Sequence, residues 1–364
     1  MSTATTRAIA FSPVQPGIVH TTTIGVPVVG EHDVEIDVLQ VGVCGTDREI
    51  IAGDIGFPPP AAAELVLGHE LAGRVRSVGP AVTTVQPGDL VSATVRRPDD
   101  CPSCQAGEPD MCTKQAYTER GIAGAHGFMA ERIVEDQRWV VPVPDKLESV
   151  AVLTEPLSVV EKGVRQARLI QQRLNYWEPE TAVVIGAGPI GILGTLLLRS
   201  QGLDVWTIAR TPAPNPKANL VTAAGATYVS GQGKSLSDVT TSIPPVDIVL
   251  ECSGSSVVAF ESIGLLANNG VAVFASVTPE DEEGHIPTGR LNRQIVAGNK
   301  VVVGTVNSGM VDFANAVSSL ERFESLWPGL TRSMITHRFT LDDDPNLATG
   351  NIPGCIKCVI EFQR

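Results

Sequence analysis

The feature that most constrains the fold is a glycine-rich turn between two apolar segments. Residues 183–185 form a short strand-like run, and Gly186, Gly188 and Gly191 follow it in a G-x-G-x-x-G spacing that opens an apolar helix-like run. Glycines in such a turn allow a tight bend and the close approach of a pyrophosphate, whose charge then lies at the amino end of the helix. The pattern predicts a dinucleotide-binding strand–turn–helix unit, and the alternative is a purely structural glycine turn.

The rest of the chain separates into two textures. From about residue 181, strand-like runs alternate with helix-like runs, which is typical of a parallel, doubly wound sheet. Before about residue 150, short β-rich segments such as 34–41 and 73–78 are separated by glycine and proline, as in a β-barrel-like domain. The texture changes near Glu155, because Pro156 suits a first helical turn. We therefore expect a domain boundary there.

Charge and composition indicate which binding partners, location and cysteine chemistry to expect. The 364 residues carry 27 Lys plus Arg against 40 Asp plus Glu, a net charge of -13, so nucleic acid and anionic membranes are poor partners. The apolar stretch 182–198 is broken by glycines and a proline, which favours a strand, turn and helix over a membrane span. The first residues show no secretory pattern, and the expected location is the cytoplasm. Seven cysteines then favour metal ligation or burial over disulfides.

The end of the next strand-like run bears on the choice of dinucleotide. Sites for NAD usually have an acidic residue here, whereas this chain has Ala209, Arg210 and Thr211. A missing carboxylate removes repulsion toward a 2′-phosphate, and an arginine supplies a fork of donors to it. NADP is therefore favoured, with NAD left open. The alternative is that Arg210 is a solvated loop residue.

Two groups of residues have the chemistry of metal ligands. Cys44 with the pair His69-Glu70 combines a thiolate, an imidazole and a carboxylate, a set that suits zinc. Cys101, Cys104 and Cys112 follow a C-x2-C-x7-C spacing, with acidic residues just before the first cysteine. Three cysteines and one carboxylate, Asp99 or its neighbour, would bind zinc less tightly than four cysteines. The alternative is an unmetallated loop of free thiols.

The segments GHELAGRV at 68–75, RSVG at 76–79 and QPGDLV at 86–91 resemble the zinc-containing medium-chain dehydrogenase/reductase superfamily. Within it, TEPLSVVEK at 154–162, VRRP at 95–98 and GTVNS at 304–308 are similar to the glucose 1-dehydrogenase family. The resemblance implies an α/β fold with a GroES-like, β-rich catalytic domain over residues 1–155. A Rossmann domain with a doubly wound parallel sheet would follow over 156–307, and residues 308–364 would return to the catalytic domain.

The resemblance also implies roles for individual residues. Catalytic zinc would be held by Cys44, His69 and Glu155, with Glu70 as a fourth ligand or beside a zinc-bound water, and Asp99 would complete the structural-zinc lobe. Thr46 and Glu70 would be catalytic, with Thr46 relaying a proton. Sugar contacts are implied for Thr46, Glu70, Glu119, Glu155 and Asn307. Cofactor contacts are expected for Gly186, Gly188, Pro189, Ile190, Gly191, Ala209, Arg210, Thr211, Ser253, Thr305, Val306, Asn307 and Lys357.

These expectations together describe an NADP-preferring, zinc-dependent glucose 1-dehydrogenase. It would oxidise an aldopyranose, D-glucose or another aldose such as D-galactose, at C1 to the lactone by hydride transfer to nicotinamide. One alternative is a zinc-dependent polyol or secondary-alcohol dehydrogenase of the same superfamily. An alternative of another class is a non-catalytic dinucleotide-binding redox sensor. A homodimer or homotetramer is expected, as is usual for this fold.

Overall fold

A computed structural model describes residues 4–278 and 283–362. The chain divides into two compact units: Met1–Glu155, Asn307–Leu320 and Ile335–Arg364 form the first, and Pro156–Val306 and Glu321–Met334 form the second. The segment 308–364 is thus shared between the units, because the long helix α9 (Met310–Leu326) begins in one and ends in the other. Within the described ranges, no helix has the length and apolar character needed to cross a membrane.

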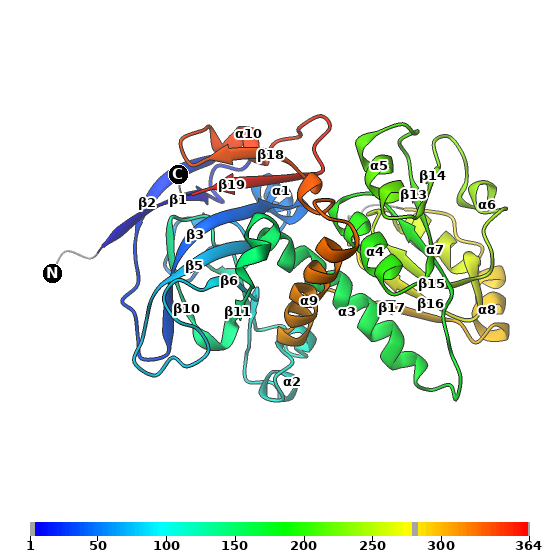
Figure 1. Ribbon diagram of the computed structural model, residues 1–364, viewed down its shortest axis with the longest axis horizontal. Coiled ribbons are helices and arrows are strands. Elements are labelled where there is room, and N and C mark those ends of the chain that lie inside the picture. The colour runs from blue at the N-terminus through cyan, green and yellow to red at the C-terminus, as the bar shows by residue number, and fades with distance from the viewer. Residues whose placement is uncertain (1–3, 279–282, 363–364) are drawn as a thin grey trace. The chain divides into compact units, whose positions relative to one another are not determined.

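The first unit is built on a seven-stranded sheet in the order β11-β6-β5-β3-β19-β18, with β10 also paired to β3. Its central strand β3 alternates buried and partly exposed residues, and Val34, Ile36 and Val38 are fully buried on its inner face. Two three-stranded sheets, β2-β1-β4 and β7-β8-β9, complete the unit. Figure 1 shows the C-terminal strands beside β3, with which β19 pairs antiparallel.

The first unit consists mainly of strands, with a few short helices between them. Its strands are β1 (Thr5–Phe11), β2 (Val19–Gly25), β3 (Asp33–Val43), β4 (Leu65–Val66), β5 (Glu70–Val78), β6 (Leu90–Ala93), β7 (Arg96–Arg97), β8 (Thr118–Arg120), β9 (Gly124–Ala125), β10 (Arg132–Asp136), β11 (Val140–Pro142), β18 (Ile335–Thr340) and β19 (Lys357–Glu361). Its α-helices are α1 (Gly45–Ala52), α2 (Pro102–Gln105) and α10 (Pro345–Thr349), and 3-10 helices cover Pro109–Met111, Gln137–Trp139 and Asp145–Leu153.

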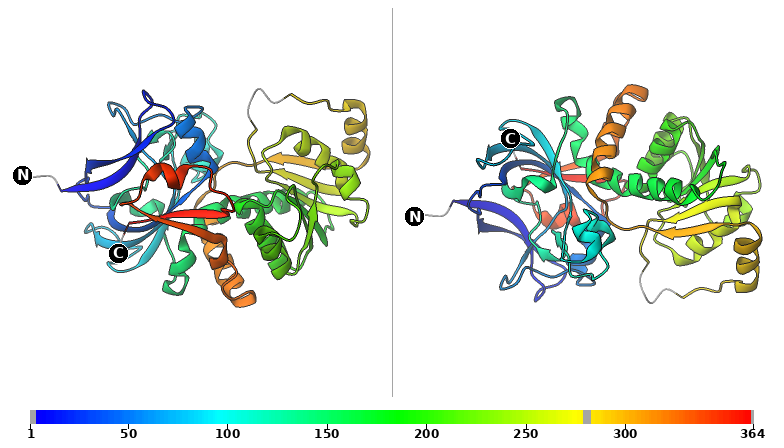
Figure 2. Two further views of the ribbon diagram at one scale, coloured as in Figure 1. Left: turned by 90° about the horizontal axis from the view of Figure 1, so that it is seen from above. Right: turned by 90° about the horizontal axis from the view of Figure 1, so that it is seen from below.

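The second unit contains a six-stranded parallel sheet in the order β14-β13-β12-β15-β16-β17. Its strands are β12 (Thr181–Ile185), β13 (Asp204–Ala209), β14 (Thr227–Ser230), β15 (Val246–Glu251), β16 (Leu266–Phe274) and β17 (Val301–Gly304). Its helices are α3 (Thr154–Gln171, from Pro156 on), α4 (Pro189–Ser200), α5 (Pro216–Ala223), α6 (Leu236–Val239), α7 (Ser256–Ser262) and α8 (Thr288–Ala297), with 3-10 helices at Ile263–Leu265 and Arg332–Met334. Figure 2 shows helices on both faces of this sheet.

This strand order is that of a Rossmann sheet. The first strand, β12, lies in the middle, and the later strands are added first on one side of it and then on the other, so the strand order reverses at β12. All five residues of β12 are buried, because helices cover both faces of a parallel sheet. The predicted doubly wound sheet is therefore confirmed. Ligands of such sheets bind at the carboxyl ends of the strands beside the reversal point.

Candidate metal centre and dinucleotide site

The first candidate site lies where two paired strands of the first unit meet. Strands β3 and β5 are antiparallel, with Gly42 opposite Glu70, so the residues after β3 lie close to those before β5. Cys44 follows β3 and His69 precedes β5. The ligand atoms of Cys44, His69 and Glu70 lie within 4.8 Å of one another. His69 and Glu70 are 4% and 1% exposed.

A buried carboxylate that sequence reasoning missed supports this group. Asp47 accepts a hydrogen bond from the backbone N–H of Cys44 at 2.8 Å through Oδ2, and its Oδ1 lies 3.6 Å from Nδ1 of His69. Burial raises the pKa of Asp47. Burial opposes the positive charge of His69, but Asp47 and Cys44 outweigh this effect and raise the pKa of His69 well above its usual value. A carboxylate on one ring nitrogen is the partner that metal-binding histidines usually have.

The buried ammonium group of Lys357 contacts two groups of this site. Strand β19 pairs with β3, and the Lys357 ammonium group forms an ion pair with Glu70 and donates to the carbonyl of Val43 at 3.1 Å. Burial disfavours its charge, but Glu70 outweighs this effect and the pKa of Lys357 is raised. A side chain on Gly42 would collide with the Glu70 carboxylate and with Lys357. Lys357 was expected at the cofactor, whereas its ammonium group here has two partners inside the first unit.

The donor set fits zinc. Thiolate, imidazole and carboxylate are ligands that zinc accepts, and Cys44, His69 and Glu70 bring one of each within 4.8 Å of one another. The structure thus brings together three of the four expected ligands. Glu155, at the first turn of α3, is not in the group within 4.8 Å, although burial and the neighbouring Glu70 raise its pKa to about 7. Thr46 is close, because its hydroxyl accepts from the Cys44 thiol at 3.8 Å.

A second donor cluster lies in the loop that carries α2. The ligand atoms of Asp99, Cys101, Cys104 and Cys112 lie within 4.8 Å of one another. The Cys112 thiol donates to Asp99 Oδ2 at 3.0 Å, and the Cys101 N–H donates to Oδ1 at 2.8 Å. These bonds lower the pKa of Asp99. The cluster fits a tetrahedral zinc site with one carboxylate, and Asp99, rather than its neighbour, is the residue brought to the cysteines.

The thiols of this loop differ in acidity. Burial raises the pKa of Cys101, but the backbone N–H groups of Cys104 and Thr113 outweigh it and lower the pKa to about 7. Burial raises the pKa of Cys104 to about 12. The thiolate is the form that binds a metal, so Cys101 is the thiol of this pair that is most easily deprotonated.

The structure joins two of the expected sugar-site residues. The Asn307 amide donates to Oε1 of Glu119 at 2.8 Å, across 188 positions of the chain. Asn307 has a positive φ of 59°, and its Oδ1 accepts the N–H of Ser308 at 2.8 Å. Sequence reasoning assigned no role to Arg96, which also holds Glu119 through two bonds of 3.0 Å.

The second candidate site lies at the carboxyl ends of the parallel strands. Gly186 follows β12 with a φ of 102°, a region that glycine tolerates, and a Cβ here would lie 2.6 Å from the carbonyl oxygen of Cys252. A Cβ on Gly191 would lie 1.9 Å from the Gly186 carbonyl oxygen, so the helix can approach the strand only without one. Gly188 has nothing within 4 Å of that position. Open space at the middle glycine is what a pyrophosphate needs.

A cavity of about 720 Å³ opens at this edge of the second unit. Of the residues expected to bind the cofactor, its lining includes Gly186, Gly188, Ala209, Arg210, Thr211 and Ser253. Lys217 and Lys234, which sequence reasoning missed, also line it, and no Asp or Glu does. Lys217 lies in the first turn of the helix after β13 and Lys234 follows the end of β14, and these places after neighbouring strands are the signal that could have found them. The cavity therefore presents three cations and no lining carboxylate to an anionic ligand.

Further expected cofactor residues lie after the ends of β15 and β17. Ser253 comes after β15, and its N–H and hydroxyl both donate to the buried carboxylate of Glu251, a residue the sequence analysis passed over. Thr305 comes after β17, where its N–H donates to the Phe274 carbonyl. The Lys162 ammonium group donates to the Val306 carbonyl at 2.9 Å. Pro189 and Ile190 begin α4 and do not line the cavity.

Comparison with protein families matches both parts of the chain. Residues 148–362 match the glucose dehydrogenase C-terminus, and residues 30–145 match the alcohol dehydrogenase GroES-like domain. The predicted GroES-like and Rossmann architecture is therefore confirmed.

Individual proteins extend this likeness over nearly the whole length. Glucose 1-dehydrogenase of Methanocella arvoryzae is 40% identical over 339 residues, which cover 93% of this chain and 94% of that protein. Glucose 1-dehydrogenase 1 of Haloterrigena turkmenica is 36% identical and covers 98% of this chain and 100% of its own.

Among solved structures, the glucose dehydrogenase of Haloferax mediterranei in complex with NADP, zinc and gluconolactone has a TM-score of 0.90 at 30% identity. The match covers 98% of this chain and 99% of that one. With a sequence match across both domains and a shared fold, the chain belongs to the glucose dehydrogenase family of the zinc-containing medium-chain dehydrogenase/reductase superfamily.

Proposed function

We propose that this protein is a zinc-dependent glucose 1-dehydrogenase that prefers NADP. The reaction removes hydride from C1 of an aldopyranose and a proton from its O1 hydroxyl, and yields the lactone, the reduced nicotinamide and a proton. The observation that carries the proposal is the cluster of the half-buried Cys44 thiol with the buried side chains of His69 and Glu70, in a chain of the glucose dehydrogenase family.

In the first unit, Cys44 and His69 would hold zinc, with Glu70 and Glu155 as the carboxylates available to it. Zinc supplies Lewis-acid polarisation of a substrate hydroxyl, and the nicotinamide supplies the hydride acceptor. Asp47 orients the imidazole through Nδ1. The Thr46 hydroxyl accepts from the Cys44 thiol and would carry the substrate proton toward water.

The sugar would be recognised by paired polar groups. Glu119 and Asn307 form a linked carboxylate and amide, which accept from and donate to hydroxyl groups respectively. Such a pair discriminates strongly against a sugar that lacks a matching hydroxyl, because the buried groups are then left without partners. Glu70, Glu155 and Thr46 would contact the reacting end of the sugar.

NADP preference is supported by the charges that line the cavity of the second unit. Arg210 presents a guanidinium group, with the Thr211 hydroxyl beside it and Lys217 and Lys234 on the following segments. These groups favour a 2′-phosphate, and no carboxylate of the lining repels it. Among the described residues, neither Arg210 nor Lys217 has an ion-pair partner that would compete.

The cysteine loop would hold a second, structural zinc. Its three thiols and the Asp99 carboxylate complete a four-donor set, which leaves no open position for substrate. We also expect the chain to assemble as a homodimer or homotetramer. Sedimentation velocity tests that expectation, and a monomer across the working concentration range would contradict it.

The direct test is initial-rate kinetics of the zinc-loaded protein with aldoses, polyols and simple alcohols, each offered with NADP and with NAD. The highest kcat/KM is expected for D-glucose or another aldose with NADP. A polyol or secondary alcohol at the top of the ranking would support the alternative enzyme. No turnover, despite bound zinc and NADP, would contradict the proposal and favour a redox sensor.

The cofactor assignment has its own test. Arg210→Ala is expected to raise the KM for NADP by about tenfold to a hundredfold, the range for charge-assisted hydrogen bonds, and to leave the KM for NAD unchanged. Lys217→Ala and Lys234→Ala are expected to act in the same direction but by a smaller factor. Equal effects on NADP and NAD would show that these cations do not read the 2′-phosphate.

A further inference from the structure

Arg96 is the residue that fixes the Glu119 carboxylate. Strands β7 and β8 are antiparallel, and their register places Arg96 opposite Glu119. The Nε and Nη2 atoms of Arg96 both donate to Oε1 of Glu119 at 3.0 Å. Both side chains are largely buried, at 5% and 13% exposure. A buried, charge-assisted fork of this kind restricts the carboxylate to one orientation.

Arg96 is itself held on two further sides. Its Nη1 donates to the backbone carbonyl of Asp110 at 3.4 Å, and its guanidinium carbon lies 3.7 Å from the centre of the Tyr117 ring. A lysine could keep the positive charge, but it has neither the fork nor the planar face for these contacts. The requirement at this position is therefore for arginine, not simply for a cation.

The contacts of Arg96 leave the second carboxylate oxygen of Glu119, Oε2, available to a ligand. Oε1 accepts from Arg96 and also from the Asn307 amide at 2.8 Å. No described residue donates a hydrogen bond to Oε2. The Asn307 amide nitrogen carries two hydrogens and uses one for Glu119, so one N–H remains, while its Oδ1 accepts from Ser308. One acceptor and one donor therefore remain side by side.

We propose that Arg96 is a positioning residue for sugar binding, which turns Oε2 of Glu119 and the spare N–H of Asn307 toward two hydroxyl groups of the substrate. This inference rests on the proposed function and adds the group that sets hydroxyl selectivity. Arg96 acts through Glu119 and takes no part in hydride or proton transfer. Its loss therefore weakens sugar binding more than it slows the chemical step.

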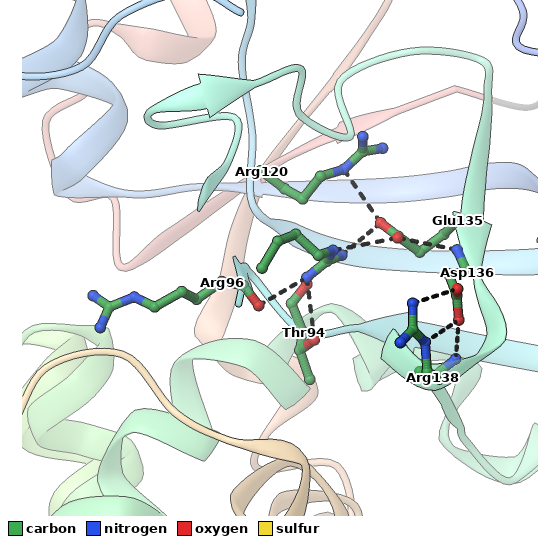
Figure 3. Close-up of polar contacts among 7 residues, drawn as sticks. Thr94, Arg96, Arg120, Glu135, Asp136 and Arg138 are labelled. Atoms are coloured by element: carbon green, nitrogen blue, oxygen red, sulfur yellow. Dashed lines mark hydrogen bonds and ion pairs between the residues drawn. The ribbon is translucent and has the colours of Figure 1, made fainter. Parts of the chain in front are cut away.

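The chain contains a matched control one position away. Arg97 follows Arg96 on β7 but forms its ion pair with Glu135, which Arg120 also contacts. Figure 3 shows Arg96 pointing away from Glu135 and Arg120, because Arg96 and Arg97 are successive residues of a strand and lie on opposite faces. Arg97 is also largely buried, at 14% exposure. Arg97→Lys thus makes the same chemical change on the opposite face of the same strand.

The experiment compares Arg96→Lys with Arg97→Lys in the zinc-loaded enzyme. For Arg96→Lys we expect the KM for glucose to rise about tenfold, with kcat within about twofold and the KM for NADP unchanged. Arg97→Lys should lower Tm and leave the KM for glucose unchanged. An unchanged KM for glucose in Arg96→Lys, or a parallel rise in both variants, would overturn the inference.

Deoxyglucoses sharpen the test. Analogues that lack one hydroxyl at C2, C3, C4 or C6 are assayed with the unchanged enzyme and with Arg96→Lys. At least one analogue should have a raised KM in the unchanged enzyme and no further rise in Arg96→Lys, because the contact is already lost. If Arg96→Lys multiplied every KM by the same factor, it would have no specific link to a hydroxyl.

A crystal structure of Arg96→Lys tests the inference without turnover. The Glu119 carboxylate is expected to rotate and to lose its bond to Asn307, whereas both stay in place in Arg97→Lys. An unmoved Glu119 in Arg96→Lys would overturn the inference even if the enzyme oxidises glucose. If the unchanged chain oxidises no aldose, the proposed function fails, and a displaced Glu119 would still show that Arg96 positions it.

Discussion

The two donor clusters of the first unit are assembled in opposite ways. Cys44, His69 and Glu70 come together through the pairing of β3 with β5, and buried ionic groups surround them. The cysteine cluster lies within one loop, residues 99–112, and its polar contacts are made largely by groups of that loop. One cluster therefore depends on the core of the unit, whereas the other is a local structure.

The two clusters also differ in the types of ligand that they offer to a metal. The first cluster mixes a thiol, an imidazole and a carboxylate, and Lys357 forms an ion pair with Glu70. The second offers three thiols and a carboxylate, a closed set with no place for a substrate. We therefore expect loss of metal from the first cluster to abolish the reaction, and loss of metal from the second cluster to lower the stability of the fold.

The largest expected effect is that of His69→Ala. Without the imidazole, the first cluster keeps one soft ligand and its carboxylates, and we expect catalytic zinc to be lost and activity to fall by more than about a thousandfold. Metal analysis should find one zinc per chain instead of two, and the circular dichroism spectrum should be unchanged. A variant with full turnover would exclude this cluster as the catalytic centre.

The next effect is expected from Asp47→Asn. The amide keeps the shape of Asp47 but removes the negative charge beside Nδ1 of His69. Loss of the carboxylate partner of a metal-bound histidine typically costs about 10-fold to 100-fold in metal affinity or activity. Zinc affinity from chelator competition, together with kcat, measures the effect. Wild-type values in both would mean that Asp47 only caps helix α1 through the Cys44 N–H.

The contrast between these clusters also explains how much could be predicted. The glycine turn after β12 and the cysteine loop are local patterns, in which spacing alone states the geometry. Both were predicted with their residues, and the alternation of strands and helices predicted the parallel sheet. Cys44 and His69 were grouped by the chemistry of their side chains, and the family resemblance supported one shared site, because the pairing of β3 with β5 is not visible in either segment.

Three of the contacts that sequence reasoning missed depend on long-range pairing. Lys357 lies against Glu70 because β19 returns from the end of the chain to pair with β3. Asn307 lies against Glu119 from 188 positions away. Arg96 joins that pair because a two-residue strand has the right register. The type of each residue suggested chemistry, but only the register of strands determines which side chains face each other.

A smaller effect, and of a different kind, is expected from Cys112→Ser. The loop should lose its zinc, and Tm should fall by several degrees, because metal that binds only the folded loop stabilises it. The kcat should stay within about threefold of the wild-type value, since the first cluster is unchanged. Thermal unfolding and metal analysis measure the effect, and a kcat as low as that of His69→Ala would contradict the division of roles.

The smallest effect, and the one that separates two roles for Asp99, is expected from Asp99→Cys. If Asp99 is a ligand, a fourth thiolate should bind zinc more tightly, which slows its removal by a chelator and raises Tm by a few degrees. The opposing effect is the loss of the bonds that Asp99 accepts from the N–H groups of Cys101 and Ala116. Thiolate ligation should outweigh these bonds, because zinc prefers a soft thiolate to a carboxylate in a structural four-ligand site. Faster zinc release and a lower Tm would instead mean that Asp99 serves the backbone of the loop, and that three cysteines hold the metal without it.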